Sequence, residues 1–306
     1  MEEKMKRIPI ILDTDPGVDD FFCMAIALAY SDVFDLKGIT TIGGNNATAI
    51  TTRNALAILN LFNCNEVPVA YGEDSFLLRP FEKAVVKFHG ENGLGNVEIE
   101  DSKCKQIDIK ASEFIYETAL SLGKELVLVT VGPQTNVGRC LLDHPDLKDH
   151  IKKIVVMGGG INTGNASQYA EANIHHDAYA SQLILDANIP VEMIGLNATR
   201  QAPLPRSVFD KMSINLNSKI RKIMQDLIDF RNGEPMHDAL AIATMIDRNC
   251  VNFKKTNINV IQSGEREGET VFDFNENGLH YIAESTNLDN YYQVLQGMVD
   301  RIKIWL

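Results

Sequence analysis

Residues 8–20 of the chain read Ile8-Pro9-Ile10-Ile11-Leu12-Asp13-Thr14-Asp15-Pro16-Gly17-Val18-Asp19-Asp20. An apolar run typical of a buried strand is followed directly by four aspartates within eight residues. Carboxylates this close repel one another, so the cluster needs a cation, a shared proton or strong hydrogen bonds to persist. A hard metal ion bound by oxygen ligands is the leading explanation, and the segment predicts an active site at the end of the first strand.

Short apolar runs and helical patterns alternate along the chain after this segment. Strands are predicted at 8–12, 38–42, 67–71, 126–131, 154–157 and 191–196, and helices at 19–30, 48–62, 113–122 and 177–187. This alternation predicts an α/β fold with a single open, mostly parallel (mixed) β-sheet flanked by helices, as in Rossmann-like folds. Ligands of such sheets bind at the carboxyl ends of the strands, where the aspartates are expected to lie.

The second half of the chain changes in pattern without any sign of a domain boundary. Helices are predicted at 217–231, 238–246 and 289–304, and β-like segments at 256–262 and 270–274. No internal repeat, low-complexity tract or linker rich in Pro, Gly and Ser is present, so one domain over residues 1–306 is expected. The long loops at 73–91 and 158–176 are predicted to cover the site.

The composition favours a neutral small-molecule partner. The 306 residues carry a formal net charge of −12 and no block of Lys and Arg, which opposes binding to nucleic acid or to an anionic membrane. No apolar run is long enough to span a bilayer, and the charged amino terminus lacks the core of a signal peptide. Five scattered cysteines without paired spacing indicate reduced thiols and a cytoplasmic location.

The ion expected at the aspartates is calcium. Asp13 and Asp15 are two residues apart at a strand end, so their side chains point to the same side. Asp19 and Asp20 would open a helix, whose dipole favours negative charge at this end. Calcium accepts about six to eight oxygen ligands in flexible geometry, and no Lys stands nearby for the phosphate that usually accompanies magnesium. The structural alternative is that Asp13 and Asp19 only cap a turn and a helix.

Three further polar segments are candidates for the site. In Met236-His237-Asp238, the adjacent side chains of His237 and Asp238 would point in different directions on a helix. One of these two could therefore act as an acid while the other completes a metal shell. The amides and carboxylate of residues 164–173 suit the hydroxyls of a neutral polyol. His89 lies in a Gly-rich loop that could close over a substrate. Each segment also has a structural alternative. His237 could be a hydrogen-bonded structural residue, residues 164–173 could be an ordinary polar loop, and His89 could be a plain surface histidine.

Taken together and in this order, these residues resemble the inosine-uridine nucleoside hydrolase family, which hydrolyses the N-ribosidic bond of nucleosides. The resemblance covers almost the whole chain and rests on these motifs: residues 13–20, Gly44-Asn45, Val131-Gly132-Pro133-Gln134-Thr135-Asn136, Met157-Gly158-Gly159, Gly164-Asn165, Ala170-Glu171-Ala172-Asn173 and His237-Asp238. It implies the nucleoside hydrolase fold, a nucleoside substrate and a homo-oligomer, either a dimer or a tetramer.

The resemblance also implies a role for each matching residue. Calcium (Ca2+) would be held by Asp15, Asp20, Asp238 and the backbone carbonyl of Val131. Asp15 would be the general base, taking a proton from a calcium-bound water, and His237 would donate a proton or a hydrogen bond to the departing base. The substrate would be bound by Asp19, Asn45, His89, Met157, Asn165, Glu171 and Asn173.

Some positions depart from the family pattern. Val131 replaces a frequent Thr, which is harmless if only its carbonyl binds the metal, and Ala172 replaces a frequent Phe beside the sugar. The tyrosines expected to stack on the base before His237 are absent, and Gln225, Asp229 and Phe230 lie in that region. The sequence therefore leaves the preferred nucleobase open.

Two other functions are compatible with part of this pattern. A haloacid dehalogenase-like phosphatase also has Asp-x-Asp after its first strand, and it would use Asp13 as the nucleophile and Asp15 with magnesium. Gly17 stands where that pattern has Thr or Val, and Asp19-Asp20 would be unexplained. A non-catalytic, calcium-dependent nucleoside or ribose-binding protein is the other alternative, against which the intact Asp15 and His237-Asp238 argue.

Overall fold

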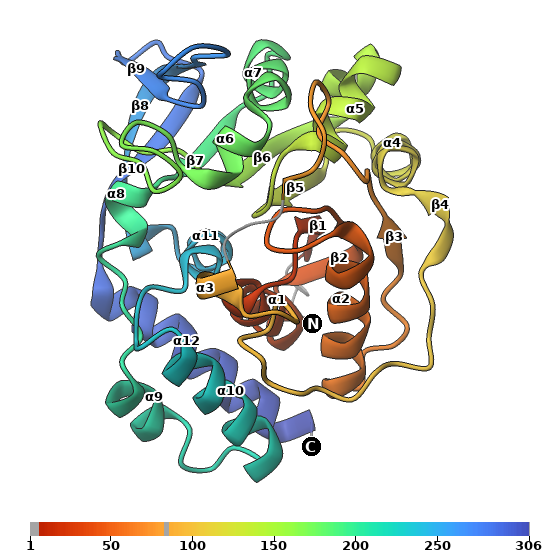
Figure 1. Cartoon of the computed structure of the whole chain (residues 1–306), viewed down its shortest axis with the longest axis vertical. Helices are drawn as coiled ribbons and strands as arrows, with labels where there is room; N and C mark the ends of the chain where they lie inside the picture. The colour runs from red at the N-terminus through yellow and green to blue at the C-terminus, as the bar shows by residue number, and fades with distance from the viewer. Residues whose placement is uncertain (1–5, 83–85, 306) are drawn as a thin grey trace.

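The computed structural model describes residues 6–82 and 86–305. Within these residues, ten strands form one sheet in the order β4-β3-β2-β1-β5-β6-β7-β10-β8-β9 (Figure 1). The strands are β1 (Ile8–Thr14), β2 (Phe34–Thr41), β3 (Val69–Tyr71), β4 (Ile107–Lys110), β5 (Leu126–Thr130), β6 (Ile151–Met157), β7 (Val191–Ile194), β8 (Val251–Val260), β9 (Thr270–Phe274) and β10 (His280–Thr286).

The sheet is mostly parallel and mixed, which confirms the predicted fold class. Neighbouring strands from β4 to β10 pair in parallel. The pairs β10–β8 and β8–β9 at one edge are antiparallel. The centrally placed β1 pairs with β2 on one side and β5 on the other, so the carboxyl end of β1 lies between two other strand ends.

The helices cover both faces of this sheet (Figure 1). They are α1 (Val18–Ala29), α2 (Thr48–Leu61), α3 (Val86–His89), α4 (Ala111–Leu122), α5 (Thr135–Asp143), α6 (Ala172–His176), α7 (Ala178–Asp186), α8 (Leu196–Thr199), α9 (Arg206–Met212), α10 (Ser218–Phe230), α11 (His237–Ile246) and α12 (Leu288–Trp305). Short 3-10 helices occur at Pro145–Asp149 and Arg248–Cys250.

Two hydrophobic clusters occupy the two faces. Ile10 and Leu12 of β1 pack with α1, α2, α10, α11 and α12 in one cluster, and Ile11 packs with α4, α5 and α7 in the other. Alternate residues of a strand point to opposite faces, so a strand buried on both sides is apolar throughout. This is why the first strand appears in the sequence as an uninterrupted apolar run.

Helix α1 is buried along its whole length. Every residue from Val18 to Ala29 is buried, because β1 and β2 cover one side of the helix and α11 and α12 pack against it elsewhere. The apolar character all round this helix in the sequence therefore reflects complete enclosure rather than an amphipathic surface helix. This enclosure fixes the position of α1, and with it the positions of Asp19 and Asp20.

Some elements differ from their predicted ranges. Strand β4 and strand β10 are absent from the prediction, and β10 lies between β7 and β8. The predicted loops at 73–91 and 158–176 contain the short helices α3 and α6. Thr135 and Asn136, at the end of the motif 131–136, form the start of α5. Among the described residues, no helix combines the length and apolar character needed to cross a bilayer.

Candidate active site

The site lies where the carboxyl end of β1 meets the loops after β2 and β5. The Asp15 carboxylate fits between two glycines of these loops. A Cβ atom added at Gly44 would lie 2.2 Å from Asp15 Oδ2, and one added at Gly132 would lie 2.6 Å from Asp15 Oδ1. Any larger residue at either position would displace the carboxylate, which explains the glycines noted in both loops.

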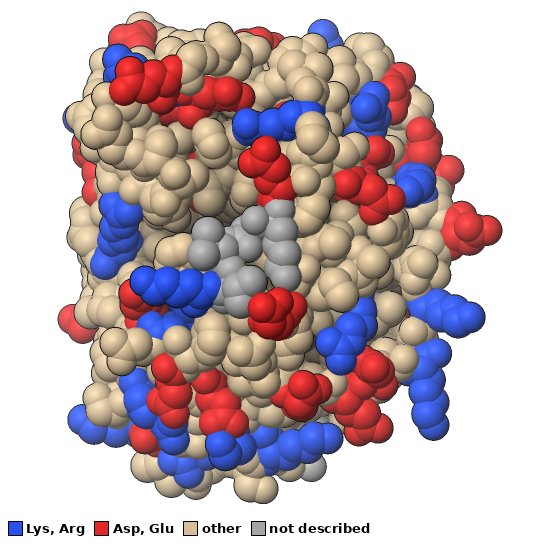
Figure 2. Space-filling model, in the orientation of Figure 1, with Lys and Arg blue, Asp and Glu red and all other residues tan. Residues whose placement is uncertain are grey.

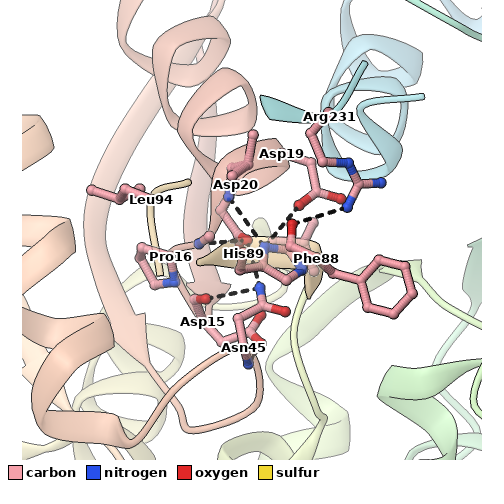
Figure 3. Close-up of polar contacts among 12 residues, drawn as sticks. Asp15, Pro16, Asp19, Asp20, Asn45, Phe88, His89, Leu94 and Arg231 are labelled. Atoms are coloured by element: carbon pink, nitrogen blue, oxygen red, sulfur yellow. Dashed lines mark hydrogen bonds and ion pairs between the residues drawn. The ribbon is translucent and has the colours of Figure 1, made fainter. Parts of the chain in front are cut away.

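Asn45 connects two of the predicted metal ligands (Figure 3). Its backbone N–H donates to Asp15 Oδ2 at 2.7 Å, and its side-chain amide donates to the Asp15 carbonyl and to Asp20 Oδ2, both at 3.0 Å. Asp20 also accepts hydrogen bonds from the Thr14 hydroxyl and, at 2.9 Å, from the N–H of Gly17. A carboxylate that accepts this N–H is the usual capping arrangement at a helix start, so Asp20 is fixed by the first turn of α1.

Asp238 brings a third element to the cluster, since it lies in the first turn of α11. Carboxylate oxygens of Asp19, Asp20 and Asp238 lie within 4.8 Å of one another, and all three side chains are buried. Burial, together with the neighbouring carboxylates, raises the pKa of Asp238 well above its ordinary value. Burial and the charge of Asp19 likewise raise the pKa of Asp20 to about 6.

The donor set fits a divalent cation. Burial and the charges of Asp20 and Asp19 also raise the pKa of Asp15 well above its ordinary value. Asp19 Oδ1 is buried and has no hydrogen-bond partner. A cation among these oxygens would relieve the repulsion that raises the pKa values and would replace the water lost on burial. Aspartates from two motifs that are distant in sequence therefore lie close together. The group within 4.8 Å contains Asp19, Asp20 and Asp238, whereas Asp15, expected as a ligand, is joined to Asp20 through Asn45.

His89 packs on the first turn of α1. Its Nδ1 accepts the N–H of Val18 at 3.3 Å and lies 3.8 Å from Asp19 Oδ1. A Cβ atom added at Gly17 would lie 2.3 Å from His89 Nδ1, so only glycine allows this contact. Burial lowers the pKa of His89 to about 4. Because Nδ1 is an acceptor, the neutral ring carries its proton on Nε2, where it can be donated.

His237 opens α11 next to Asp238. Its Nδ1 lies 2.7 Å from the hydroxyl of Thr199, at the end of α8. Desolvation lowers the pKa of His237 to about 4, against the opposing charge of Asp19. His237 is therefore neutral near pH 7 and can donate or accept a hydrogen bond, which is compatible with contact to a neutral ligand.

Arg231 is a site residue that the sequence analysis missed. It directly follows α10 and is only 7% exposed. Although burial raises the pKa of Asp19, the guanidinium of Arg231 and then His89 and His237 lower it, and the net effect is a lowered pKa. The sequence signal was weak, because a cation at a helix carboxyl terminus usually only complements the helix dipole.

A second group of predicted residues lies at the ends of β5 and β6. Glu171 caps α6: its carboxylate accepts the N–H groups of Asn173 at 3.0 Å, Ile174 at 3.2 Å and Gly159 at 3.1 Å. Burial raises the pKa of Glu171 to about 7. The side-chain amide of Asn173 donates to the Val131 carbonyl at 2.8 Å and to the Met157 carbonyl at 3.2 Å.

These contacts place Val131, Met157, Glu171 and Asn173 together. The Val131 carbonyl already accepts the Asn173 amide, but a carbonyl has two lone pairs and can accept a second partner. Asn165 differs from this group because it is exposed. Its side-chain oxygen accepts the N–H of Ala172 at 2.9 Å, which ties the 164–173 loop to the start of α6.

Asp13 is a buried residue of β1 and lies two residues before Asp15 in the chain. Its Oδ1 accepts the Thr40 hydroxyl at 2.5 Å and the Asn136 amide at 2.7 Å, while Oδ2 has no hydrogen-bond partner. Burial raises the pKa of Asp13 to about 6. Asp13 therefore links β1 to β2 and α5 rather than capping a turn.

The outer surface carries no single block of basic side chains on the face that Figure 2 shows. Lys and Arg are interspersed there with Asp and Glu, and the face has a hollow near its centre.

Comparisons with known proteins identify the family. The family model for inosine-uridine preferring nucleoside hydrolases matches residues 10–301. A pyrimidine-specific ribonucleoside hydrolase of Salmonella arizonae is 33% identical over 279 residues, which cover 87% of this chain and 89% of that protein. A non-specific ribonucleoside hydrolase of Salmonella paratyphi C is 34% identical over 271 residues, which cover 86% and 87%.

A solved structure agrees with these relatives. The purine-preferring ribonucleoside hydrolase from Gardnerella vaginalis superposes with a TM-score of 0.90 and 34% sequence identity, covering 97% of this chain and 99% of that one. Membership in this family disfavours the phosphatase alternative, which would need a different chemistry at the same aspartates. The chain therefore belongs to the inosine-uridine preferring nucleoside hydrolases, enzymes that act on the N-glycosyl bonds of ribonucleosides.

Proposed function

We propose that this protein is a calcium-dependent ribonucleoside hydrolase that releases free base and ribose. The observation that carries the proposal is the convergence of buried carboxylates from α1 and α11, those of Asp19, Asp20 and Asp238, with the buried Asp15 held next to Asp20 by Asn45 at the end of β1. Cleavage of a glycosidic bond develops positive charge on the sugar, and a carboxylate-rich pocket stabilises that charge. The same carboxylates would disfavour an anionic substrate.

The metal would be held by Asp15, Asp20, Asp238 and the carbonyl of Val131. When bound, such an ion makes water more acidic and holds sugar hydroxyls by its positive charge. We favour Ca2+ because three carboxylates and a backbone carbonyl form the flexible, all-oxygen set that this ion accepts.

Asp15 would act as the general base that accepts a proton from the attacking water. Two observations support this role: the N–H of Asn45 orients one carboxylate oxygen, and the absence of a side chain at Gly44 and Gly132 leaves the space that the carboxylate occupies. A base held in one orientation loses little entropy when the reaction begins.

The ribose hydroxyls would be bound by Asp19, Glu171, Asn173 and Asn165, with Asn45 and Met157 lining the pocket. Asp19 has a buried, unpartnered oxygen available for a hydroxyl. Asn165 would have to release the N–H of Ala172 before its side chain could reach a sugar. We therefore rank Asn165 below the other three as a ligand.

His237 and His89 would form hydrogen bonds with the departing base. Both rings have a lowered pKa of about 4, so near pH 7 each would donate a hydrogen bond as a neutral imidazole. The relatives are named pyrimidine-specific, non-specific and purine-preferring, so they do not transfer one base preference to this chain. Gln225 and Asp229 are bonded to Asp210 and Arg206 instead of facing a base.

The test is chromatographic detection of free base from a panel of ribonucleosides and deoxyribonucleosides, with calcium present. Release of base from ribonucleosides is expected, with little from deoxyribonucleosides that lack a hydroxyl of the diol. Binding of nucleosides without release of base over long incubation would instead identify a nucleoside-binding protein. Light scattering would test the accompanying proposal of a homo-oligomer built from one-domain subunits.

A further inference from the structure

Arg231 is a buried cation to which the proposed reaction assigns no role. Its side chain is 6% exposed, and a guanidinium withdrawn from water is costly unless it has partners. The backbone N–H of Arg231 closes the last turn of α10 by donating to the carbonyl of Leu227, but this contact does not involve the guanidinium. The buried position of the guanidinium therefore needs a separate explanation.

The guanidinium reaches two separate segments of the chain. One terminal nitrogen, Nη1, donates to the carbonyl of Phe88 at 3.4 Å, and the other, Nη2, donates to the carbonyl of Pro235 at 3.4 Å. Phe88 directly precedes His89, and Pro235 lies two residues before His237. One side chain thus spans the two segments that carry the site histidines.

The same side chain faces the carboxylate cluster. Figure 3 shows the Arg231 guanidinium directed toward Asp19, with the Phe88 carbonyl beside it. His89 lies 3.8 Å from the same aspartate. Asp19 belongs to the enclosed helix α1, so it offers a fixed point against which the two segments can be located.

The chemistry of arginine suits this arrangement and that of lysine does not. A planar guanidinium presents donors in two directions from one rigid group, and it can meet two carbonyls at once. A lysine ammonium is a point charge on a flexible stem, and it would retain the positive charge near Asp19 without spanning both carbonyls.

We propose that Arg231 is a positioning residue for the leaving-group side of the site, which holds His89 and His237 in place by joining the Phe88 carbonyl to the Pro235 carbonyl. The inference rests on the proposed nucleoside hydrolase activity, because it concerns the two histidines assigned to the departing base.

The test compares Arg231→Lys with the wild type on two kinds of substrate. Hydrolysis of uridine or inosine needs help at the base, whereas a nitrophenyl riboside has a leaving group that departs unaided. A misplaced catalytic group costs up to about 100-fold, so we expect kcat for the nucleosides to fall by about 10- to 100-fold with little change in KM. The rate with nitrophenyl riboside should stay within about 3-fold, since no histidine acts on that leaving group.

A double-mutant cycle separates positioning from a general structural effect. If Arg231 acts through His237, then Arg231→Lys should add less than about 3-fold to the loss already caused by His237→Ala. Glu234→Gln is the matched control, because it removes the charge of the exposed carboxylate 3.7 Å from the same guanidinium and leaves the two carbonyls that accept from Arg231 in place. That variant should keep wild-type rates on both substrates.

Equal losses on both substrates, or losses that multiply independently in the double variant, would overturn the inference. Thermal unfolding and circular dichroism check the fold, and Arg231→Gln repeats the comparison if the lysine variant is not folded. Failure of both variants to fold would make Arg231 a structural residue and would also overturn the inference. A wild-type protein that cleaves neither substrate would instead refute the proposed function itself.

Discussion

The two sides of this site are held in different ways. Asp15 stands at the end of a central strand that pairs with strands on both sides, and its carboxylate fits between two glycines. The histidine side consists of short segments, α3 and the turn before α11, which are joined by a few side-chain contacts to backbone atoms. The end of β1 and the buried helices α1 and α11 position the carboxylates, whereas contacts of individual side chains help to position the groups assigned to the base.

This difference suggests where variation should be tolerated. Relatives with pyrimidine, purine and broad preferences share the family of this chain. We expect the carboxylate side to be common to all of them, because a change there disturbs the central strands. We expect the base preference to reside on the histidine side, where loops can change without repacking the sheet.

The largest expected effect comes from removal of the metal from the carboxylate side. Treatment with a chelator should abolish release of base, and added Ca2+ should restore it more effectively than Mg2+ does. The ion-free protein should also unfold at lower temperature, because a ligand that binds only the folded state stabilises it. Activity that survives exhaustive chelation would contradict the metal-dependent proposal.

The ion-free protein should also become less stable as the pH rises. Burial and Asp19 raise the pKa of Asp20 from 3.8 to about 6 in the folded state, so between these values the folded state binds more protons than the unfolded state. Stability that is present below about pH 4 should therefore be lost as the pH rises through 6. Thermal unfolding with and without Ca2+ across this range would reveal the difference, and a flat profile without the ion would argue against it.

Asp15→Asn should produce the next largest effect. Loss of a general base costs about 100- to 10,000-fold in rate, while the amide fills the same space between the two glycines. The variant should keep its circular dichroism spectrum. Near-normal turnover measured by release of base would remove Asp15 from the role of base.

His237→Ala tests the other side of the comparison. We expect a loss of about 100-fold with uridine or inosine, because the base departs without a hydrogen-bond donor. The activated nitrophenyl riboside should lose far less. If both substrates lose the same factor, His237 does not assist the leaving group.

Gly44→Ala sharpens the comparison with a change of one methyl group. The added Cβ would lie 2.2 Å from Asp15 Oδ2, so kcat/KM should fall by at least about 10-fold as the carboxylate shifts. Gly123→Ala is the control, because Gly123 has a φ of +59° and no atoms within 4 Å of an added Cβ. Because this backbone conformation is strained for alanine, the change should cost about 1–3 kcal/mol of stability, and it should leave the rate unchanged. Equal rates for the two variants would show that the gap at Asp15 has no function.

The sequence was most informative where local pattern and packing coincide. The apolar run 8–12, the helix after it and the parallel strands were predicted because burial on both faces leaves a direct mark on composition. The helix predicted at 177–187 is present as α7, and Asp177 caps it, because its carboxylate accepts the N–H of Ala180 at 3.0 Å.

The missed elements depend on contacts that no local pattern records. Strand β10 exists because β7 and β8 offer it partners on both sides, and β4 is a short edge strand of four residues. Arg231 acquires its environment from Phe88, which is far away in the chain. Residue spacing and secondary-structure propensity cannot reveal such a partner, because the contact between the two residues forms only when the chain has folded.

The enclosure of α1 has a consequence for how this enzyme can change over time. Because no residue of α1 faces solvent, no position of this helix can be substituted without an effect on packing. Each substitution must preserve the side-chain volume at its position. Adaptation to a new nucleobase is therefore directed away from the helix that bears Asp19 and Asp20. It falls instead on exposed positions of α3 and of the turn at 231–236, such as Phe88 and Glu234, where an altered residue has room to be accommodated.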